Sequence, residues 1–382
     1  MKICVITAAR SDYDRLCYLI RTMLKHPDMQ VDIVPIHMHL SPEYGLTVRQ
    51  IEEDGFPVAD CVEMLLSSAT DVGASKSIGV GIIGLSDVLR RLSPDLVMVL
   101  GDRSELLSVA SVCICQRIPL AHLCGGEITE GAIDDQVRHM LTKAAHLHFA
   151  ANRTFGNRIL QMGEEDWRVC VSGSPALDDI QDLPFLSRQE LERDLDIDLS
   201  SKTALVTYHP VTLEHVDLKT RMRDIVQAMA CRNLHYVITY PNADAGSDVI
   251  VQAFQEFAAG NEKRVRFVKN LGRLRYLSLM RCVCMVIGNS SSGIVEAPSF
   301  NVPVVNIGNR QTGRVFGSNV IQADDTRASI AGAIDRALAY ARPSCENPYG
   351  DMKASGRIVA FMENVFLTRG KRRILWKKFV DR

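Results

Sequence analysis

The sequence lacks an excess of charge of either sign. Its 382 residues carry 44 basic and 45 acidic side chains, which gives a formal net charge of −1. A protein that binds DNA, RNA or an anionic membrane through a broad electrostatic surface carries a clear basic excess. We therefore expect neither a nucleic-acid partner nor a membrane partner.

The cysteines lack the spacing of a zinc site. The chain has 11 cysteines but no CxxC pair. Two CxC pairs, at 113–115 and 282–284, have no second cysteine cluster at zinc spacing, so we interpret them as small core residues. Because residues 1–10 run straight into a predicted strand, without a signal peptide, we expect reduced thiols in the cytoplasm.

Long apolar runs and a dinucleotide motif are also missing. No uninterrupted apolar run reaches the roughly 18 residues that a membrane span needs. The first predicted strand leads into TAARSDYD at residues 7–14, where a dinucleotide-binding fold has GxGxxG. The sequence therefore predicts neither a transmembrane helix nor a dinucleotide cofactor.

Short β-rich runs alternate with longer amphipathic runs along the whole chain. This pattern is typical of an α/β fold with parallel sheets covered by helices on both faces. The predicted strands are 2–7, 31–37, 95–100, 119–123, 147–150 and 169–172 in the first half, and 203–208, 236–240, 265–268, 283–287 and 302–307 in the second. We therefore predict two doubly wound domains with a cleft between them.

A proline-containing, charged segment separates the two halves near residues 175–200. The predicted domains are residues 1–180 and 190–351, followed by a C-terminal helix and tail over 352–382. The tail is basic and contains Trp376 and Phe379. We expect these rings to pack back on the body with the lysines in solvent; an anion-binding tail is the alternative.

The segment from residue 100 to 139 is rich in charge and begins where a buried strand ends. Asp102 falls at the carboxyl end of that strand, which is where ligands bind in open α/β sheets. Gly125 and Gly126 are expected to let the backbone approach a ligand, and Glu127 follows them. Four carboxylates near one strand end, those of Asp102, Glu127, Asp134 and Asp135, favour acid/base chemistry.

A helix is expected to start near Gly131 in this segment. Within this helix Asp134 and Arg138 are four residues apart, as are Asp135 and His139, so each pair shares one side of the helix and the two sides are adjacent. The structural alternative is that the two aspartates complement the helix dipole and that Asp134 pairs with Arg138. We expect at least one of these aspartates to have that structural role.

The second half carries a turn suited to a diphosphate. The strand 283–287 leads into GNSSSG at 288–293, where backbone N–H groups and serine hydroxyls face one point, and Glu296 could accept bonds from a ribose. The alternative is N-capping by Asn289 or a serine, with Glu296 as a first-turn charge. A second turn, with Arg310 at a strand end, favours the nucleotide; Arg314 is either a further contact or a solvated charge.

Two more strand ends carry polar residues. Arg10 follows the first strand and favours an anionic ligand, whereas Asp12 is equally well explained as a ligand contact or, like Ser11, as a helix cap. His209 ends the first strand of the second half. It is either structural or a candidate acid or anion ligand.

In the order and spacing of its motifs the chain resembles the hydrolysing UDP-N-acetylglucosamine 2-epimerases of sialic acid and related nonulosonic acid synthesis. The likeness covers nearly the whole chain. The residues that carry it are Arg10-Ser-Asp12, Gly101-Asp-Arg103, Gly125-Gly-Glu127, Asp134-Asp135, Arg138-His139, His209-Pro-Val-Thr212, Pro241-Asn242, Asn289-Ser-Ser291, Glu296 and Arg310-Gln311. The resemblance implies two Rossmann-like domains of the GT-B type, a UDP-sugar substrate and a homo-oligomer, dimer or tetramer.

The resemblance also implies a reaction. The C2 proton is removed with expulsion of UDP from C1, water adds to C1 of the resulting glycal, and C2 is reprotonated from the other face. It assigns acid/base roles to Asp102 and Asp134, and with less definition to Glu127. The implied ligand contacts are His209 at the diphosphate or sugar, Ser290 and Ser291 at the diphosphate, Glu296 at the ribose, Arg310 and Arg10 at the phosphates, and Asp12, Arg103, Asp135, Arg138, His139, Asn242 and Asn289 elsewhere on the substrate. No metal and no cofactor are needed for the leaving group.

One departure concerns the sugar. Members that make N-acetylmannosamine have a glutamate directly before the Gly-Gly pair, where this chain has Cys124. Together with Thr129-Glu-Gly-Ala132, this resembles the branch that acts on UDP-N,N'-diacetylbacillosamine on the way to legionaminic acid. A non-hydrolysing 2-epimerase, a GT-B glycosyltransferase and a non-catalytic sugar-nucleotide binding protein are the alternative functions.

Overall fold

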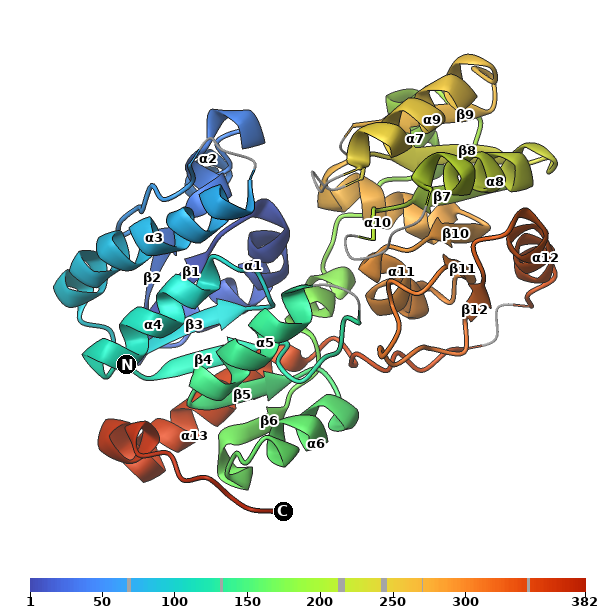
Figure 1. The fold of residues 1–382 in the computed structure, drawn as a ribbon. Helices are drawn as coiled ribbons and strands as arrows, with labels where there is room; N and C mark the ends of the chain where they lie inside the picture. The colour runs from blue at the N-terminus through green and yellow to red at the C-terminus, as the bar shows by residue number, and fades with distance from the viewer. Residues whose placement is uncertain (67–69, 131–132, 212–216, 242–245, 270, 342–343) are drawn as a thin grey trace. The chain divides into compact units, whose positions relative to one another are not determined.

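The computed structural model describes residues 1–66, 70–130, 133–211, 217–241, 246–269, 271–341 and 344–382. It divides into two units (Figure 1). Unit 1 contains Met1–Glu127, Ile133–Gln181 and Tyr349–Arg382, and unit 2 contains Ile128–Ala132 and Asp182–Pro348. The end of the chain therefore returns to the unit in which the chain begins.

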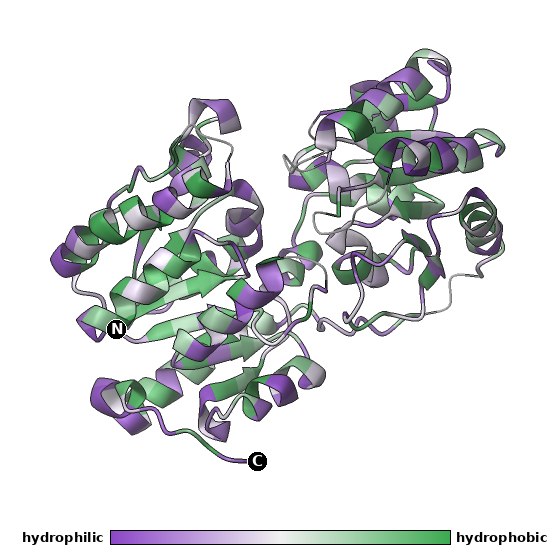
Figure 2. Cartoon of the chain, viewed as in Figure 1, coloured by the Kyte–Doolittle hydropathy of each residue, from purple (hydrophilic) through white to green (hydrophobic). Residues whose placement is uncertain are grey.

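Unit 1 is built on a parallel sheet of six strands in the order β2-β1-β3-β4-β5-β6. The strands are β1 (Lys2–Thr7), β2 (Gln30–Pro35), β3 (Leu96–Leu100), β4 (Leu120–Leu123), β5 (Leu147–Ala150) and β6 (Val169–Val171). Figure 2 shows these strands as predominantly hydrophobic. Buried runs of this kind form strands whose two faces are both covered.

Helices cover both faces of this sheet because successive strand residues point to opposite sides. Ile3 and Val5 of β1 pack in the core under α1 and α13, whereas Cys4 and Ile6 pack in the core under α3, α4 and α5. The helices of unit 1 are α1 (Arg10–Leu24), α2 (Val48–Glu53), α3 (Asp71–Leu92), α4 (Leu106–Gln116), α5 (Ile133–Ala144), α6 (Arg153–Gln161) and α13 (Ala354–Leu375).

Unit 2 repeats the architecture with the order β12-β11-β10-β7-β8-β9. Its strands are β7 (Thr203–Thr207), β8 (His235–Thr239), β9 (Val265–Val268), β10 (Met285–Gly288), β11 (Val304–Ile307) and β12 (Val320–Ala323), all parallel. Its helices are α7 (Arg188–Leu195), α8 (Leu218–Ala230), α9 (Ser247–Ala259), α10 (Gly272–Cys282), α11 (Ser291–Val295) and α12 (Arg327–Leu338). The expected fold class, two Rossmann-like doubly wound domains, is confirmed.

The sequence missed one strand. Strand β12 was not predicted, because it is a short edge strand with a polar residue, Gln322, among its four. In α3, glycines and serines interrupt the apolar residues, so it has no continuous apolar run, as expected. By length and composition alone α3 is apolar enough to cross a membrane, a test that a core helix also passes.

The C-terminal tail packs on unit 1 partly as expected, because the ring of Phe379 lies against Gly163 but Lys377 is not in solvent. The Trp376 and Phe379 side chains are 64% and 67% exposed, whereas the ammonium of Lys377 lies against Glu164 at 2.9 Å and donates to the carbonyls of Lys143 and Ala145. Buried Arg168 donates to the carbonyl of Trp376. The tail is held by the half-buried ammonium of Lys377, to which the fold presents a carboxylate and two carbonyls, and by the ring of Phe379 against Gly163.

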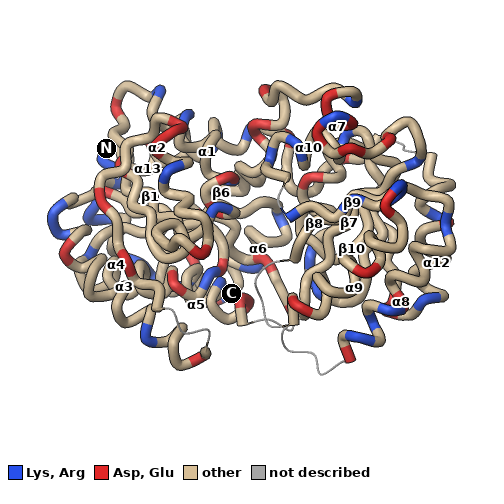
Figure 3. The backbone as a smooth tube through the Cα atoms, turned by 90° about the horizontal axis from the view of Figure 1, so that it is seen from above, with Lys and Arg blue, Asp and Glu red and all other residues tan. Residues whose placement is uncertain are grey.

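Acidic and basic residues are interspersed over both units (Figure 3). This distribution agrees with the nearly balanced composition. All 11 cysteines are free thiols in the structure.

Candidate active site

Each sheet has one point where the strand order reverses. In unit 1 it lies between β1 and β3, and in unit 2 between β7 and β10. The loops that leave neighbouring strands at such a point run to opposite sides and open a crevice at the carboxyl edge of the sheet. The candidate residues follow these four strands: Arg10 and Asp12 follow β1, Asp102 and Arg103 follow β3, His209 follows β7, and Asn289 follows β10.

At the unit 1 reversal point, a buried ion-pair cluster surrounds Arg103. Its Nε lies 2.5 Å from Oε1 of Glu105 and 3.8 Å from Oδ2 of Asp12. Burial alone would lower the pKa of the Arg103 guanidinium, but the carboxylates around it raise that pKa. Glu105 and Asp12 contribute most to the raised pKa, and the charge of Asp134 adds to them.

Asp12 occupies the third position of α1, whose N-cap is Ala9. The expected alternative of a cap by Ser11 or Asp12 is therefore wrong. Burial raises the pKa of the Asp12 carboxyl to about 6, against the opposing effect of Arg103. Arg10 begins the same helix and lies 3.6 Å from Asp14 in a half-exposed ion pair.

Arg138 brings three of the candidate residues together. Its side chain extends from α5, is 2% exposed, and pairs with the carboxylate of Asp102. The same guanidinium donates to the carbonyl of Glu127 at 3.2 Å and lies 3.6 Å from Asp135. The Asp102 side chain stays 29% exposed, so one buried cation orients a carboxylate that solvent or substrate can reach.

His139 lies one turn from Asp135, with 3.6 Å between Nε2 and Oδ2, as its spacing predicted. Burial lowers the pKa of this imidazole, while Asp135 opposes the change. Arg138 forms ion pairs with Asp102 and Asp135, and the helical pairing expected with Asp134 stays a prediction.

His122 was not singled out from the sequence, yet it supports the loop that carries Asp102. It is fully buried on β4, its Nε2 lies 2.7 Å from the carbonyl of Gly101, and its Nδ1 lies 3.1 Å from the hydroxyl of Thr142. Burial lowers its pKa to about 4. A neutral ring that donates from Nε2 to a carbonyl fits these contacts.

The two glycines before Glu127 leave space for neighbouring atoms of unit 1, where a Cβ would collide with them. A Cβ at Gly126 would lie 2.4 Å from the carbonyl oxygen of Phe155, and one at Gly125 would lie 2.8 Å from the hydroxyl of Thr142. The expected role of these glycines, close approach to a ligand, is not needed to explain them. Their role is to place Glu127, which is itself buried, beside Arg138.

In unit 2, Asn289 ties the ends of β7 and β10 together. Its side-chain oxygen accepts from the backbone N–H of His209 at 2.7 Å, and its side-chain nitrogen donates to the carbonyl of His209 at 2.8 Å. Gly288 precedes it, and a Cβ there would lie 1.9 Å from the carbonyl of Thr207. Only glycine allows the two strands to approach this closely.

The hydroxyl-rich turn is held by a chain of hydrogen bonds. Ser290 is the N-cap of α11 and accepts from the N–H of Ser292, and the hydroxyl of Ser292 contacts that of Tyr276 at 2.6 Å. Ser291 begins the helix, which ends after five residues at Val295. Glu296 therefore caps the end of α11, and the expectation of a first-turn charge is wrong.

Arg310 and its neighbour Gln311 reach back to this turn. Both donate to the carbonyl of Asn289, at 3.1 and 2.8 Å. Burial, with a contribution from Arg310, lowers the pKa of His209 to about 3. A neutral imidazole beside an arginine at a strand end is suited to contact a ligand rather than to hold a positive charge of its own.

One expected ligand contact, Asn242, lies outside the described residues. Glu105, His122 and Tyr276 are supporting residues that the sequence did not single out, and a polar residue in an otherwise apolar strand was the signal for His122.

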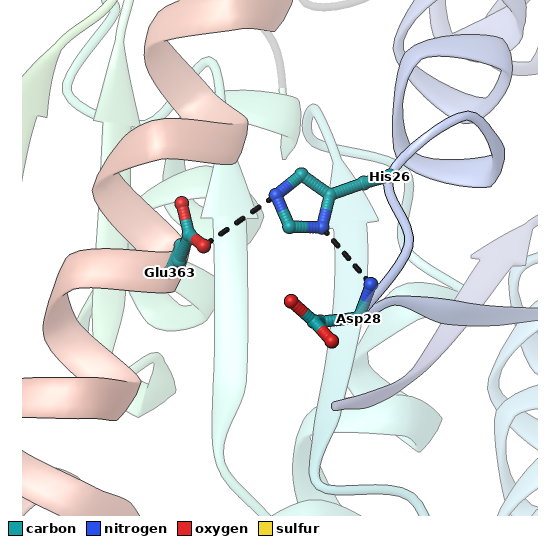
Figure 4. A group of neighbouring side chains, drawn as sticks. All are labelled: His26, Asp28 and Glu363. Atoms are coloured by element: carbon teal, nitrogen blue, oxygen red, sulfur yellow. Dashed lines mark hydrogen bonds and ion pairs between the residues drawn. The ribbon is translucent and has the colours of Figure 1, made fainter.

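One group of side chains among the described residues has the spacing of metal ligands, and it lies away from both reversal points. The ligand atoms of His26, Asp28 and Glu363 lie within 4.8 Å of one another (Figure 4). Nδ1 of His26 already accepts from the N–H of Asp28, and Nε2 lies 3.5 Å from Glu363. An ion pair between α13 and the end of α1 explains this group.

Comparison with known proteins agrees with this arrangement. A family model described as UDP-N-acetylglucosamine 2-epimerase matches residues 21–363. The chain is 39% identical over 324 residues to the GDP/UDP-N,N'-diacetylbacillosamine 2-epimerase (hydrolyzing) of Campylobacter jejuni, covering 85% of this chain and 84% of that protein. It is 34% identical over 364 residues to the UDP-N,N'-diacetylbacillosamine 2-epimerase (hydrolyzing) of Legionella pneumophila, covering 95% and 96%.

The fold also matches a solved structure. UDP-GlcNAc 2-epimerase from Neisseria meningitidis bound to UDP-GlcNAc superimposes with a TM-score of 0.82 at 18% identity, over 95% of this chain and 100% of that one. With a family model spanning most of its length and relatives above 30% identity, this chain belongs to the UDP-N-acetylglucosamine 2-epimerase family.

Proposed function

We propose that this protein is a hydrolysing 2-epimerase that converts a UDP-2-acetamido sugar into UDP and the free 2-epimer. The observation that carries the proposal is the carboxylate of Asp102, held by the buried Arg138 at the reversal point of unit 1 and still partly open to solvent. Removal of a carbon-bound proton needs a base that is fixed in position and accessible to the substrate. The expected products are UDP and a sugar of the N-acetylmannosamine type.

The reaction has two steps with different needs. In the first, a base takes the C2 proton, the electron pair forms the C1–C2 double bond, and the C1–O bond breaks to release UDP. In the second, water adds its oxygen to C1 of the glycal while an acid returns a proton to C2 on the other face. Two acid/base groups on opposite sides of the ring are therefore required, and we assign them to Asp102 and Asp134.

The remaining unit 1 residues position these groups. Arg138 orients Asp102 and the backbone of Glu127. Arg103 pairs with Asp12 and Glu105, and the negative charge of Asp134 also raises the pKa of Arg103. Arg103 and Arg10 supply positive charge for an anionic ligand. Glu127 is the nearest carboxylate along the chain to Cys124, and we propose that it takes the proton-transfer role of the glutamate that Cys124 replaces.

Unit 2 is proposed to hold UDP. The hydroxyls of Ser290 and Ser291 and the guanidinium of Arg310 lie around the β10 end, and they stabilise the charge that builds on the leaving diphosphate. Neutral His209 donates a hydrogen bond to the diphosphate or sugar, and Glu296 accepts from the ribose hydroxyls. No metal or cofactor is part of this proposal.

For the sugar, we propose UDP-N,N'-diacetylbacillosamine over UDP-GlcNAc. The two relatives with the highest identities given above are named for the former, and Cys124 stands where the N-acetylmannosamine-forming members carry a glutamate. We further propose that the enzyme serves legionaminic acid or related nonulosonic acid synthesis in the cytoplasm, as a homo-oligomer.

The test is turnover of each UDP-sugar without any acceptor. Purified full-length protein is incubated separately with UDP-N,N'-diacetylbacillosamine and UDP-GlcNAc, and free UDP and free sugar are measured. Equal amounts of UDP and 2-epimerised sugar, with the diacetyl substrate preferred, support the proposal. A 2-epimer still linked to UDP would identify the non-hydrolysing reaction, and turnover only after an acceptor is added would identify a glycosyltransferase.

A further inference from the structure

His37, which lies two residues after strand β2 in unit 1, has a backbone conformation that side chains rarely adopt. Its φ is 54°. Other residues with a positive φ, such as Ser93 and Arg117, are the C-caps of helices α3 and α4, where a left-handed residue is usual. His37 caps no helix end and lies at the carboxyl edge of the sheet, where ligands bind in open α/β folds. Backbone strain of this kind is concentrated at functional sites.

The His37 side chain faces the ion-pair cluster of Arg103. It is 14% exposed, and its Nδ1 lies 3.3 Å from Oε1 of Glu105, which itself pairs with Arg103. Nη2 of Arg103 donates to the sulfur of the next residue, Met38, at 3.2 Å. The backbone N–H of Met38 donates to the carbonyl of Ala8, just after β1. The segment that carries His37 is therefore fixed beside the reversal point of unit 1.

The hydrogen bonds of the fold do not require the His37 ring, in contrast to the ring of His39 in the same segment. His39 is fully buried, and its two ring nitrogens lie 3.1 and 2.7 Å from the hydroxyls of Thr7 and Thr47. Nδ1 of His37 is also buried, but it makes no aligned hydrogen bond with any residue that the structure describes. Buried polar atoms are usually hydrogen-bonded, so His39 has a structural role and His37 needs another explanation.

The surroundings of His37 set its protonation state. Burial lowers the pKa of its imidazole, Glu105 opposes this change and Arg103 adds to it. The ring is therefore neutral near pH 7, with one donor and one acceptor nitrogen. The Glu105 carboxylate, whose own pKa is lowered by Arg103 against the effect of burial, only accepts hydrogen bonds. The proton of the ring therefore belongs on Nδ1, and Nε2 is the acceptor that the ring offers to a ligand.

The position of His37 selects the part of the sugar that it meets. In the sheet order β2-β1-β3, Asp102 follows β3 and His37 follows β2, two strands away. Adjacent strands are about 4.8 Å apart, so the two residues lie on opposite sides of a site about 10 Å wide, which accommodates one substituted pyranose ring. The proposed reaction places C2 at Asp102. The substituents at C4 and C5, on the far side of the ring, then lie toward His37.

We propose that His37 determines which sugar the enzyme accepts, because its Nε2 accepts a hydrogen bond from the N–H of the acetamido group at C4 of UDP-N,N'-diacetylbacillosamine. UDP-GlcNAc has a hydroxyl at this carbon. A hydroxyl rotates to find another partner, such as water, whereas an amide N–H has one direction and is left unpaired when its acceptor is removed. The inference rests on the proposed function, since it concerns the same site.

The first test compares both sugar nucleotides in variants of His37. Glycine adopts a φ of 54° without strain, so His37→Gly is expected to unfold at a temperature no lower than the wild type. For this variant, KM for UDP-N,N'-diacetylbacillosamine is expected to rise by about tenfold with kcat within about twofold, while kcat/KM for UDP-GlcNAc falls by less than about threefold. His37→Asn tolerates a left-handed φ and keeps an acceptor oxygen, so it is expected to recover part of the lost preference.

Ser93→Gly is the matched control. Ser93 has a similar φ of 46° in the same unit, but it caps the end of α3 and precedes β3, at the amino edge of the sheet. The substitution relieves the same backbone strain far from the reversal point. It is expected to leave the preference between the two sugar nucleotides unchanged, so a changed preference in His37→Gly reports the loss of the ring and not the relief of strain.

A binding experiment separates this inference from the proposed reaction. In the full-length Asp102→Asn protein, with and without His37→Gly, calorimetric titration measures the Kd of both sugar nucleotides and of UDP. A loss of affinity of about tenfold for the diacetyl compound, with a smaller loss for UDP-GlcNAc and none for UDP, supports the inference whether or not the wild type turns either compound over. Equal losses for the two sugar nucleotides, no loss for either, or no binding of the diacetyl compound would overturn it. A wild type that binds both compounds but releases no UDP would overturn the proposed reaction alone.

Discussion

Arg138 reaches from α5 to the carboxylate of Asp102 at the end of β3, so that a buried cation fixes a carboxylate that is still 29% exposed. The two residues are 36 positions apart, and their meeting depends on the packing of α5 beside the sheet. The pair orients the carboxylate of Asp102, and a general base must be held in position in this way.

Asp102→Asn is expected to lower kcat by about a thousandfold, because an amide cannot accept the C2 proton. UDP affinity is expected to stay within about twofold, since the diphosphate is assigned to unit 2. Steady-state kinetics and calorimetric UDP titration check this. Asp95→Asn is the matched control at the opposite end of the same strand, where the side chain accepts from the N–H of Lys2 and faces no candidate residue; near-wild-type turnover is expected for it.

Arg138 is a positioning residue, and its variants separate position from charge. Arg138→Lys keeps the charge but loses the planar group that contacts Asp102 and the carbonyl of Glu127 together, so kcat is expected to fall by about tenfold or more with little change in KM. Arg138→Met is expected to cost about 2–3 kcal/mol of unit 1 stability as well, because it leaves Asp102 and the Glu127 carbonyl without their partner. Urea unfolding and kinetics on the same samples check both. An Arg138→Met variant that is as stable as the wild type would show that this side chain does not organise the site.

Much of the architecture follows from local patterns. Most strands of both sheets are continuous buried runs, and the reversal points fall where Asp102 and His209 end their strands. What could not be predicted depends on contacts between distant segments. The contact of Arg138 with Asp102, and the pairing of Lys377 with Glu164 beside an exposed Trp376, were both decided by tertiary neighbours that spacing along one helix or tail does not reveal.

Glu296→Gln is expected to raise KM by about tenfold with kcat nearly unchanged, because an amide is a weaker acceptor for ribose hydroxyls that are bound equally in ground and transition states. Ser291→Ala is expected to raise KM as well. Ser318→Ala, an exposed serine of the same unit whose hydroxyl contacts Cys345, is the control and should leave both constants unchanged. A fall in kcat alone for Glu296→Gln would contradict a ribose contact.

Asp12 gives unit 1 a predictable pH dependence. Burial raises its pKa to about 6 from 3.8 in the unfolded chain. Between pH 4 and pH 6 the carboxyl loses its proton in the unfolded chain but keeps it in the folded protein. The free energy of unfolding that the raised pKa contributes is therefore fully present below about pH 4 and is lost as the pH rises through about 6. Asp12→Asn does not ionise, and its stability relative to the wild type is expected to improve by about 2 kcal/mol between pH 4 and pH 7.

Urea unfolding of both proteins at several pH values within this range measures the difference directly. If the difference between Asp12→Asn and the wild type were the same at every pH, the raised pKa of Asp12 would be excluded.

Two adjacent lysines of the tail provide a matched pair. Lys377→Met is expected to cost about 2–3 kcal/mol, because it removes the ammonium that contacts Glu164 and two carbonyls, and Glu164 is then held by Lys143 and His148 alone. Lys378→Met is expected to change stability by less than about 0.5 kcal/mol, as is usual for exposed sites. Thermal unfolding of the two variants checks this, and equal effects would contradict the account of the tail.

The central claim is that UDP leaves by elimination and that water then completes the epimer. The most direct measurement is proton and carbon NMR of the sugar released from UDP-N,N'-diacetylbacillosamine in heavy water. The account predicts a free 2-epimer with one solvent deuterium at C2, in amounts equal to the UDP formed. A released sugar that keeps its original C2 hydrogen would contradict it.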